Sequence, residues 1–292
     1  MCMVYNNLKK GVEKMENLEQ RWESLTLADD FLFGKIMSEP TLCAEMLRRI
    51  FPDLDIGEIK NIETQKTLKH ALHIRGVRFD ILTAAARNIF DIEAQNRMLR
   101  DLFPRSRAYQ IVIGYDSLNK NSLKKSGSYE DLPNTYVIFI CTFDLFGKGR
   151  HIYSFRNFCA EDKEIELNDG AYTIFLNTKG KLNDVSPELK NFLKFVDNGK
   201  IVDGDTFVKI LDKKLKEAKH NTKWRDEFML LLTREDEKFA EGRAGGIKEA
   251  NERVAADMLK ENLPLPLVSK ISQLSEDVIR GIAVKLGIAI TG

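Results

Sequence analysis

The sequence has few cysteines and no long apolar run, and each shortage excludes a class of protein. Its four cysteines form no CxxC pair and have no histidine at zinc-finger spacing, which argues against a disulfide framework or a structural zinc site. No run of about 18 apolar residues occurs, and the first twenty residues lack an apolar signal core. We therefore expect a cytoplasmic protein with reduced thiols that is neither exported nor membrane-spanning.

The sequence also lacks an excess of charge of either sign. It has 45 Lys and Arg against 44 Asp and Glu, for a formal net charge of +1, so any nucleic-acid surface has to be local. Neither GxGxxG nor GxxxxGK[ST] occurs, which leaves nucleotide-phosphate binding of those kinds unsupported. The 292 residues, of which 43% are hydrophobic, suit a globular protein with a substantial core.

The spacing of apolar residues predicts a mixed α/β core followed by a helical extension. Helical spacing runs through residues 8–50 and resumes near Pro104, whereas alternation predicts strands at 58–67, 76–84 and 89–96. The run TYVIFICTF predicts a central, buried strand, and shorter strand signals follow at HIYSF and AYTIFL.

From Ser186 onward the pattern is helical, and it includes a long charged helix over roughly 221–262. The glycines of EGRAGGIKE in this helix predict a bend or break. We divide the chain into an N-terminal helical segment (1–24), a core (25–200) and a helical C-terminal extension (201–292).

The stretch GVRFDILTAAARNIFDIEAQ, residues 76–95, predicts a hairpin with an acid in each strand. Alternation puts Phe79 on the apolar face, and Asp80 and Glu93 on a polar face away from the core. A four-residue loop, 85–88, gives opposed residues an index sum of 173. That sum makes Asp80 and Glu93 direct partners, with Arg78 opposite Gln95, and like charges so placed destabilise a sheet.

A divalent cation would resolve this conflict. Two carboxylates with waters and a backbone carbonyl, for which we nominate Ala94, form a hard-oxygen site for Mg²⁺ or Mn²⁺. A metal held there can activate water and stabilise charge on a phosphodiester. The alternative is an edge strand with a solvated outer face, on which Asp80 pairs with Arg78 or a lysine.

Several motifs occur in an order that resembles the PD-(D/E)XK nuclease family transposases, a group of recombination-promoting nucleases. They are LADDFLFGKIM, GVRFDI, FDIEAQNR, RSRAYQ, YVIFICTFDLFGKGRHIYSFRN and FLNTKGKLNDVSPELKNFLKFV, over about residues 25 to 200. The resemblance implies a restriction-endonuclease-like PD-(D/E)XK core, with a mixed central sheet flanked by helices, that cleaves DNA with Mg²⁺. It implies metal binding by Asp80 and Glu93.

The resemblance also implies that Gln95 orients the attacking water, at a place where the wider superfamily has a lysine. Because Gln can hydrogen-bond but carries no charge, positive charge must come from the metal or an arginine. Arg78, Arg97, Arg105 and Arg107 are candidates for this role or for binding DNA phosphates. The alternative for each is an exposed partner of Asp101 or Asp91.

Asp30 resembles an acid of the family and is a possible additional ligand, the alternative being a helix N-cap. The resulting hypothesis is a magnesium-dependent DNA endonuclease linked to recombination, mobile elements or defence against foreign DNA. A catalytically inactive nuclease-fold module that binds DNA or another partner is the alternative. Because cutting both strands needs two sites, a homodimer is also an expectation.

Overall fold

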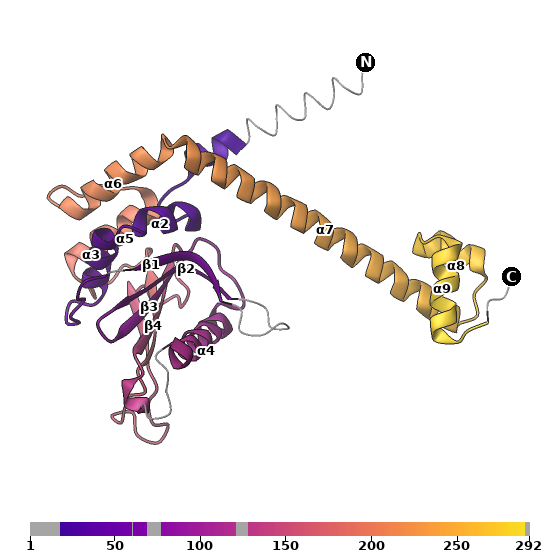
Figure 1. Ribbon diagram of the computed structural model, residues 1–292, viewed down its shortest axis with the longest axis horizontal. Helices are drawn as coiled ribbons and strands as arrows, with labels where there is room; N and C mark the ends of the chain where they lie inside the picture. The colour runs from indigo at the N-terminus through magenta and orange to yellow at the C-terminus, as the bar shows by residue number, and fades with distance from the viewer. Residues whose placement is uncertain (1–17, 60, 69–76, 121–127, 290–292) are drawn as a thin grey trace, which may run out of the picture. The chain divides into compact units, whose positions relative to one another are not determined.

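The computed structural model describes residues 18–59, 61–68, 77–120 and 128–289 (Figure 1). The chain divides into two compact units, residues 1–225 and 226–292. Of the predicted N-terminal helical segment, residues 18–24 are helical, and residues 1–17 lie outside the described ranges. None of the helices in these ranges is both long enough and apolar enough to cross a lipid bilayer.

A six-stranded mixed sheet forms the centre of the first unit, in the order β1-β2-β3-β4-β6-β5. The strands are β1 (Ile62–Leu68), β2 (Val77–Ala85), β3 (Asn88–Gln95), β4 (Asn134–Cys141), β5 (Ile152–Phe155) and β6 (Ala171–Asn177). β1, β2 and β3 are antiparallel neighbours, β3, β4 and β6 are parallel, and β5 is antiparallel to β6. The run TYVIFICTF is therefore central and buried, as predicted.

Helices flank both faces of this sheet. On one side lie α2 (Asp30–Met37), α3 (Pro40–Ile50), α5 (Pro187–Asn198) and α6 (Thr206–Lys219), and on the other lies α4 (Leu102–Lys120) (Figure 1). A short 3₁₀ helix, η1 (Tyr129–Asp131), precedes β4. Pro104 lies in the first turn of α4, where proline is tolerated, as predicted. The expected mixed α/β architecture, a central sheet flanked by helices, is confirmed.

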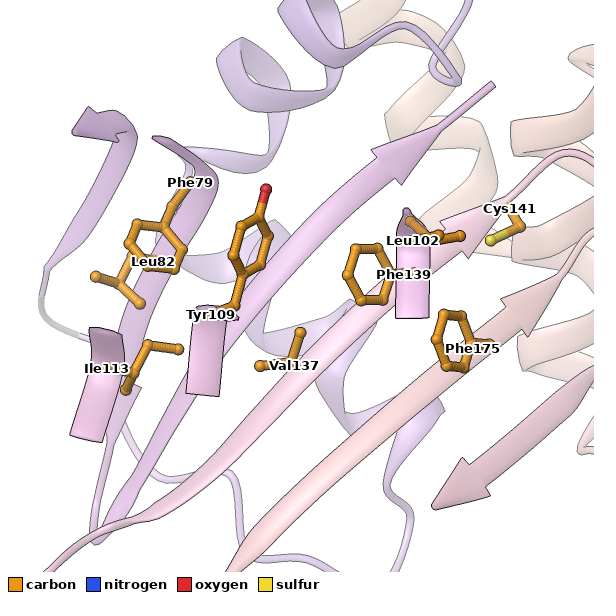
Figure 2. Packing of buried hydrophobic residues seen from close by; sticks show 9 residues of the cluster. All are labelled: Phe79, Leu82, Leu102, Tyr109, Ile113, Val137, Phe139, Cys141 and Phe175. Atoms are coloured by element: carbon orange, nitrogen blue, oxygen red, sulfur yellow. The ribbon is translucent and has the colours of Figure 1, made fainter. Parts of the chain in front are cut away.

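The core beside α4 is built around stacked aromatic rings. It contains Phe79, Leu82, Leu102, Tyr109, Ile113, Val137, Phe139, Cys141 and Phe175 (Figure 2). The Phe139 ring stacks on Phe175 with centroids 5.1 Å apart and on Tyr109 at 6.1 Å. Phe79 and Leu82 share this cluster, although alternation along β2 would put them on opposite faces. The predicted placement of Phe79 on the face opposite Leu82 is therefore wrong.

An ion pair joins α3 to the residue that precedes α6. The two terminal nitrogens of the Arg49 guanidinium, on α3, each lie 2.8 Å from a carboxylate oxygen of Asp205. Asp205 also caps α6 by accepting from the Val208 N–H (3.2 Å). These contacts and the packing of α6 against α2 and α5 place α6 in the first unit. That unit ends at residue 225, and not at residue 200, where the sequence had suggested that the extension begins.

The second unit contains most of α7 (Thr222–Lys260), with α8 (Leu265–Ser272) and α9 (Glu276–Leu286). These helices share a small core of Ala255, Leu259, Leu265, Val268, Ile279 and Ala283. α7 continues without interruption through Gly242, Gly245 and Gly246, so the predicted break is wrong. Each glycine costs a helix only about 1 kcal/mol relative to Ala, and the helix formers on both sides outweigh that cost.

We predict that Phe139→Ala lowers the free energy of unfolding by about 3–5 kcal/mol, because it removes a fully buried ring and leaves a cavity between two stacked partners. Denaturant unfolding measures the change. Phe155→Ala is the control, since Phe155 also contacts Phe175 but is 46% exposed. Equal losses in the two variants would contradict the assigned core.

Candidate functional site

The register of the acidic hairpin is as predicted, but its turn is shorter. Opposed residues from Ile81 and Ile92 to Ala85 and Asn88 keep the index sum of 173. The strands extend to Ala85 and Asn88, so the turn has two residues and the predicted four-residue loop is wrong. Ala86, the first residue of this turn, adopts the left-handed conformation with φ of 51°.

Regular backbone pairing of β2 with β3 stops at Ile81, and two acidic side chains take over. The Asp80 N–H donates to Glu93 Oε1 at 2.9 Å, and the Ala94 N–H donates to Asp80 Oδ2 at 3.2 Å. Each carboxylate thus satisfies an N–H of the opposite strand, which would otherwise be buried without a partner. Asp80 and Glu93 therefore lie together, as predicted, but the ladder includes neither their predicted direct pairing nor that of Arg78 with Gln95.

The acidic face of this hairpin is buried. Asp80 is 9% exposed, Glu93 2% and Asp91 0%. Asp91 and Glu93 of β3 pair with Val137 and Phe139 of the cluster beside α4, and α2 packs against β2 close enough for Asp30 to act on Asp80. The prediction of a polar row away from the core is wrong, and so is the alternative of a solvated edge, since β2 and β3 are both interior strands.

Burial is the main reason why these acids hold their protons tightly. It raises the pKa of Asp80 to about 7 and that of Glu93 to about 8. Negative neighbours add to the effect, namely Asp30 for Asp80 and Asp80 for Glu93. The pKa values are lowered in turn by the backbone N–H bonds and by Arg105, but these effects are smaller.

Asp91 is a third acid of the site that the sequence reasoning did not assign to it. Its two buried carboxylate oxygens accept no N–H or O–H from the described residues. Burial, then repulsion from Glu93 and a hydrogen bond of the protonated acid to Glu93, raise its pKa well above the usual range. The signal was present, because alternation along DIEAQ puts Asp91 on the same face as Glu93 and Gln95. Its burial depends on α4, and the alternation of residues along a strand does not show which helix covers that face.

Arg105, in the first turn of α4, is the cation at this site. Its Nη2 donates to the Tyr109 hydroxyl at 2.7 Å and lies 3.4 Å from Glu93 Oε2, and its Nη1 lies 3.5 Å from Gln95 Oε1. The Tyr109 hydroxyl donates to the same Glu93 oxygen at 3.2 Å. Tyr109 therefore holds Arg105 and Glu93 together.

The other predicted arginines do not reach the carboxylates in this way. Arg97 and Arg107 are exposed, and neither side chain forms a hydrogen bond or ion pair with another described residue. Arg78 is exposed too, but its charge lowers the pKa of Asp80. Of the four candidates, Arg105 is the one that the fold brings into contact with Glu93 and Gln95.

Asp30 and Ala94 both lie beside Asp80. Asp30 is the exposed first residue of α2 and is close enough to raise the pKa of Asp80. The N-cap of α2 is Asp29, so the N-cap interpretation of Asp30 is wrong. Ala94 approaches through its N–H, and the use of its carbonyl as a metal ligand stays a prediction.

The acids fit a hard divalent cation on charge and on donor type. Asp80, Glu93 and Asp91 offer only oxygen ligands, and two guanidinium groups, those of Arg105 and the exposed Arg78, do not balance three carboxylates. The two carboxylate oxygens of Asp91, which accept no hydrogen bond, indicate the same shortage of positive charge. Within the described ranges, no three Asp, Glu, His or Cys side chains are already arranged to hold a metal. The predicted site uses two carboxylates, with waters and a backbone carbonyl as its other ligands.

Comparison of the chain with protein-family models, with curated proteins and with solved structures found no match.

We predict that the metal-free protein loses stability as the pH rises from about 5 to about 8. In the unfolded chain both acids ionise near pH 4, whereas the folded pKa values are about 7 for Asp80 and about 8 for Glu93. The folded state therefore binds more protons in this window, and its stability falls with rising pH. Thermal unfolding in EDTA at a series of pH values measures the slope.

Glu93→Gln should flatten that slope, because it removes one titrating acid and its repulsion. A pKa that differs by one between the folded and unfolded states changes the free energy of unfolding by about 1.4 kcal/mol. Asp53→Asn is the control, since Asp53 is an exposed loop residue and should leave the slope unchanged. The same slope in wild type and Glu93→Gln would contradict the assignment.

Proposed function

We propose that the protein is a metal-dependent DNA endonuclease with a PD-(D/E)XK-type core, acting in recombination, in mobile elements or in defence against foreign DNA. The observation that carries the proposal is the buried pair of carboxylates, Asp80 and Glu93, each bonded to the backbone of the other strand. Their raised pKa values indicate that the nearby positive charge does not balance them. A cytoplasmic setting and a homodimer with two active sites belong to the same proposal.

The strand arrangement supports this proposal. The two acids lie on the β2–β3 hairpin, and β3 is followed in the sheet by the parallel strands β4 and β6. Glu93 and Gln95 are near the carboxyl end of β3, and ligands of open α/β sheets bind beside the carboxyl ends of strands.

Each residue has a role that its chemistry allows. Asp80 and Glu93 would hold Mg²⁺ or Mn²⁺, with Ala94 contributing its carbonyl. Such a metal supplies an activated water and stabilises charge on the phosphodiester. The Gln95 amide can orient that water through hydrogen bonds.

Arg105 compensates for the missing lysine. Its guanidinium contacts both Glu93 and Gln95, so a fixed positive charge lies beside residue 95. A lysine at position 95 would repel it at this distance. We propose that Arg105 supplies the charge stabilisation that lysine supplies in the wider superfamily.

One observation favours the alternative, a nuclease-fold module that binds DNA or another partner without cleaving it. The Arg105–Glu93 ion pair, together with protonation of Asp80 and Asp91, would give a cluster that needs no metal. The alternative therefore predicts no metal binding that depends on Glu93.

We predict that the protein nicks or linearises plasmid DNA in Mg²⁺ or Mn²⁺ and not in EDTA. Asp80→Asn and Glu93→Gln should each reduce the rate by at least about 100-fold, because each removes a metal ligand. Gel analysis measures the rate, and calorimetric titration with Mn²⁺ measures binding. Asp53→Asn is again the control.

Cleavage that persists in Glu93→Gln would refute the proposed site. Absence of cleavage together with absence of Mn²⁺ binding, in a protein that still binds DNA, would establish the inactive module instead.

We predict that Arg105→Gln lowers kcat by about 100-fold, because it removes the fixed charge beside Glu93 and Gln95. The matched variant is Arg107→Gln, two residues further along α4 and exposed. A phosphate-binding Arg107 would affect KM and leave kcat nearly unchanged. Steady-state cleavage of a short duplex separates the two constants, and equal kcat values in the two variants would refute the role of Arg105.

A further inference from the structure

The carboxyl ends of three parallel strands form one straight edge of the sheet. Gln95 of β3 pairs with Cys141 of β4, which pairs with Asn177 of β6. The alignment continues one residue further, since the Thr142 N–H donates to the Gln95 carbonyl and the Thr178 N–H donates to the Cys141 carbonyl, both at 3.0 Å. The candidate active site lies at the β3 end of this edge.

Exposed cations follow each of these strand ends, and we call them the cationic edge. After β3 come Arg97 and Arg100, between β4 and β5 come Lys148 and Arg150, and after β6 comes Lys181. The Arg150 carbonyl accepts from the side-chain amide of Asn177 at 2.8 Å, which places Arg150 at the end of β6.

The two loops that carry Lys148, Arg150 and Lys181 are bonded to each other. The Gly149 carbonyl accepts from the Lys181 N–H at 2.7 Å and from the Leu182 N–H at 3.1 Å. Within the first loop, the Asp144 carboxylate accepts from the N–H groups of Gly147 and Gly149, each at 3.0 Å. Lys148 and Lys181 therefore extend from neighbouring, internally bonded segments.

The acids of the loops after β4 and β6 are already engaged, whereas Asp101, which follows β3, is exposed. Asp144 binds the two backbone N–H groups of its own loop. Asp184 accepts from the backbone N–H of His151 at 3.1 Å and contacts the ring Nδ1 at 2.8 Å, and Asp197 pairs with Lys179 at 2.6 Å. By contrast, four cations of the edge form no ion pair with another described residue, namely Arg97, Arg100, Lys148 and Lys181.

We propose that the cationic edge binds the sugar–phosphate backbone of duplex DNA and leads it to Asp80 and Glu93. This inference rests on the proposed function, and it adds where the substrate lies. Three strands at about 4.8 Å spacing span roughly 10 Å, which matches about three base pairs at ~3.4 Å each. Binding through phosphates does not depend on base sequence.

The test measures binding apart from cleavage. In the Glu93→Gln background, the affinity for a fluorescent duplex is followed by anisotropy over a range of salt concentrations, with and without Lys148→Ala and Lys181→Ala together. Loss of two phosphate contacts should weaken binding about 10-fold or more and reduce the slope of log K against log salt by about 2. Lys200→Ala with Lys209→Ala, two exposed lysines outside this edge, should change neither quantity.

An unchanged affinity would overturn the proposal. A weaker affinity with an unchanged salt slope would overturn it too, because the loss of phosphate contacts reduces the slope of log K against log salt. Thermal unfolding should be the same for all variants, since exposed substitutions change stability by no more than about 0.5 kcal/mol. If the parent protein binds DNA through these lysines but never cleaves it in metal, the surface stands and the proposed enzyme function fails. If the protein cleaves DNA in metal but its affinity for DNA does not depend on these lysines, the enzyme function is supported and the cationic edge is refuted.

Discussion

The hydrogen bonds that Asp80 and Glu93 each accept from the opposite strand determine how the residues around the candidate site are arranged. Each carboxylate accepts a backbone N–H from the opposite strand, so the β2–β3 ladder ends at Ile81. Beyond that point Phe79 joins the cluster beside α4. Removing either acid would leave a buried N–H unpaired, while keeping both leaves like charges in a buried place. The same two residues therefore support the local fold and create a charge conflict that a bound cation would relieve.

Much of the arrangement of the hairpin could be predicted from the sequence, because pairing arithmetic depends only on the turn. The index sum of 173 predicted the register, and with it the approach of Asp80 to Glu93. Alternation shows which residues share a face, but not whether another element covers that face. The acids were therefore predicted to lie on a polar face away from the core, whereas they are buried. For the same reason the sequence pattern did not reveal the buried position of Asp91 or the single arginine that reaches Glu93.

Local propensity was a weaker guide than packing elsewhere in the chain. The β-branched and aromatic content of TYVIFICTF predicted a central strand correctly, because such a run needs burial on both faces. Glycine content predicted a break in α7 that does not occur, because each glycine adds only a small cost in a helix of 39 residues. The extent of the first unit reflects long-range contacts such as the Arg49–Asp205 pair, which joins residues 156 positions apart. No local pattern could have indicated it.

Although the net charge is only +1, acidic and basic residues near the candidate site occupy different places. This separation matters for the proposed substrate. The acids of the candidate site are buried, whereas the cations at the carboxyl ends of β3, β4 and β6 are exposed. An approaching polyanion would therefore meet the cations first, since exposed charges act over about 10 Å at moderate salt. Arg105 lies between the two sets, one quarter exposed and in contact with Glu93. In this arrangement the buried acids need not repel a phosphate, because Arg105 and a bound metal would offset their charge at the point where the phosphate arrives.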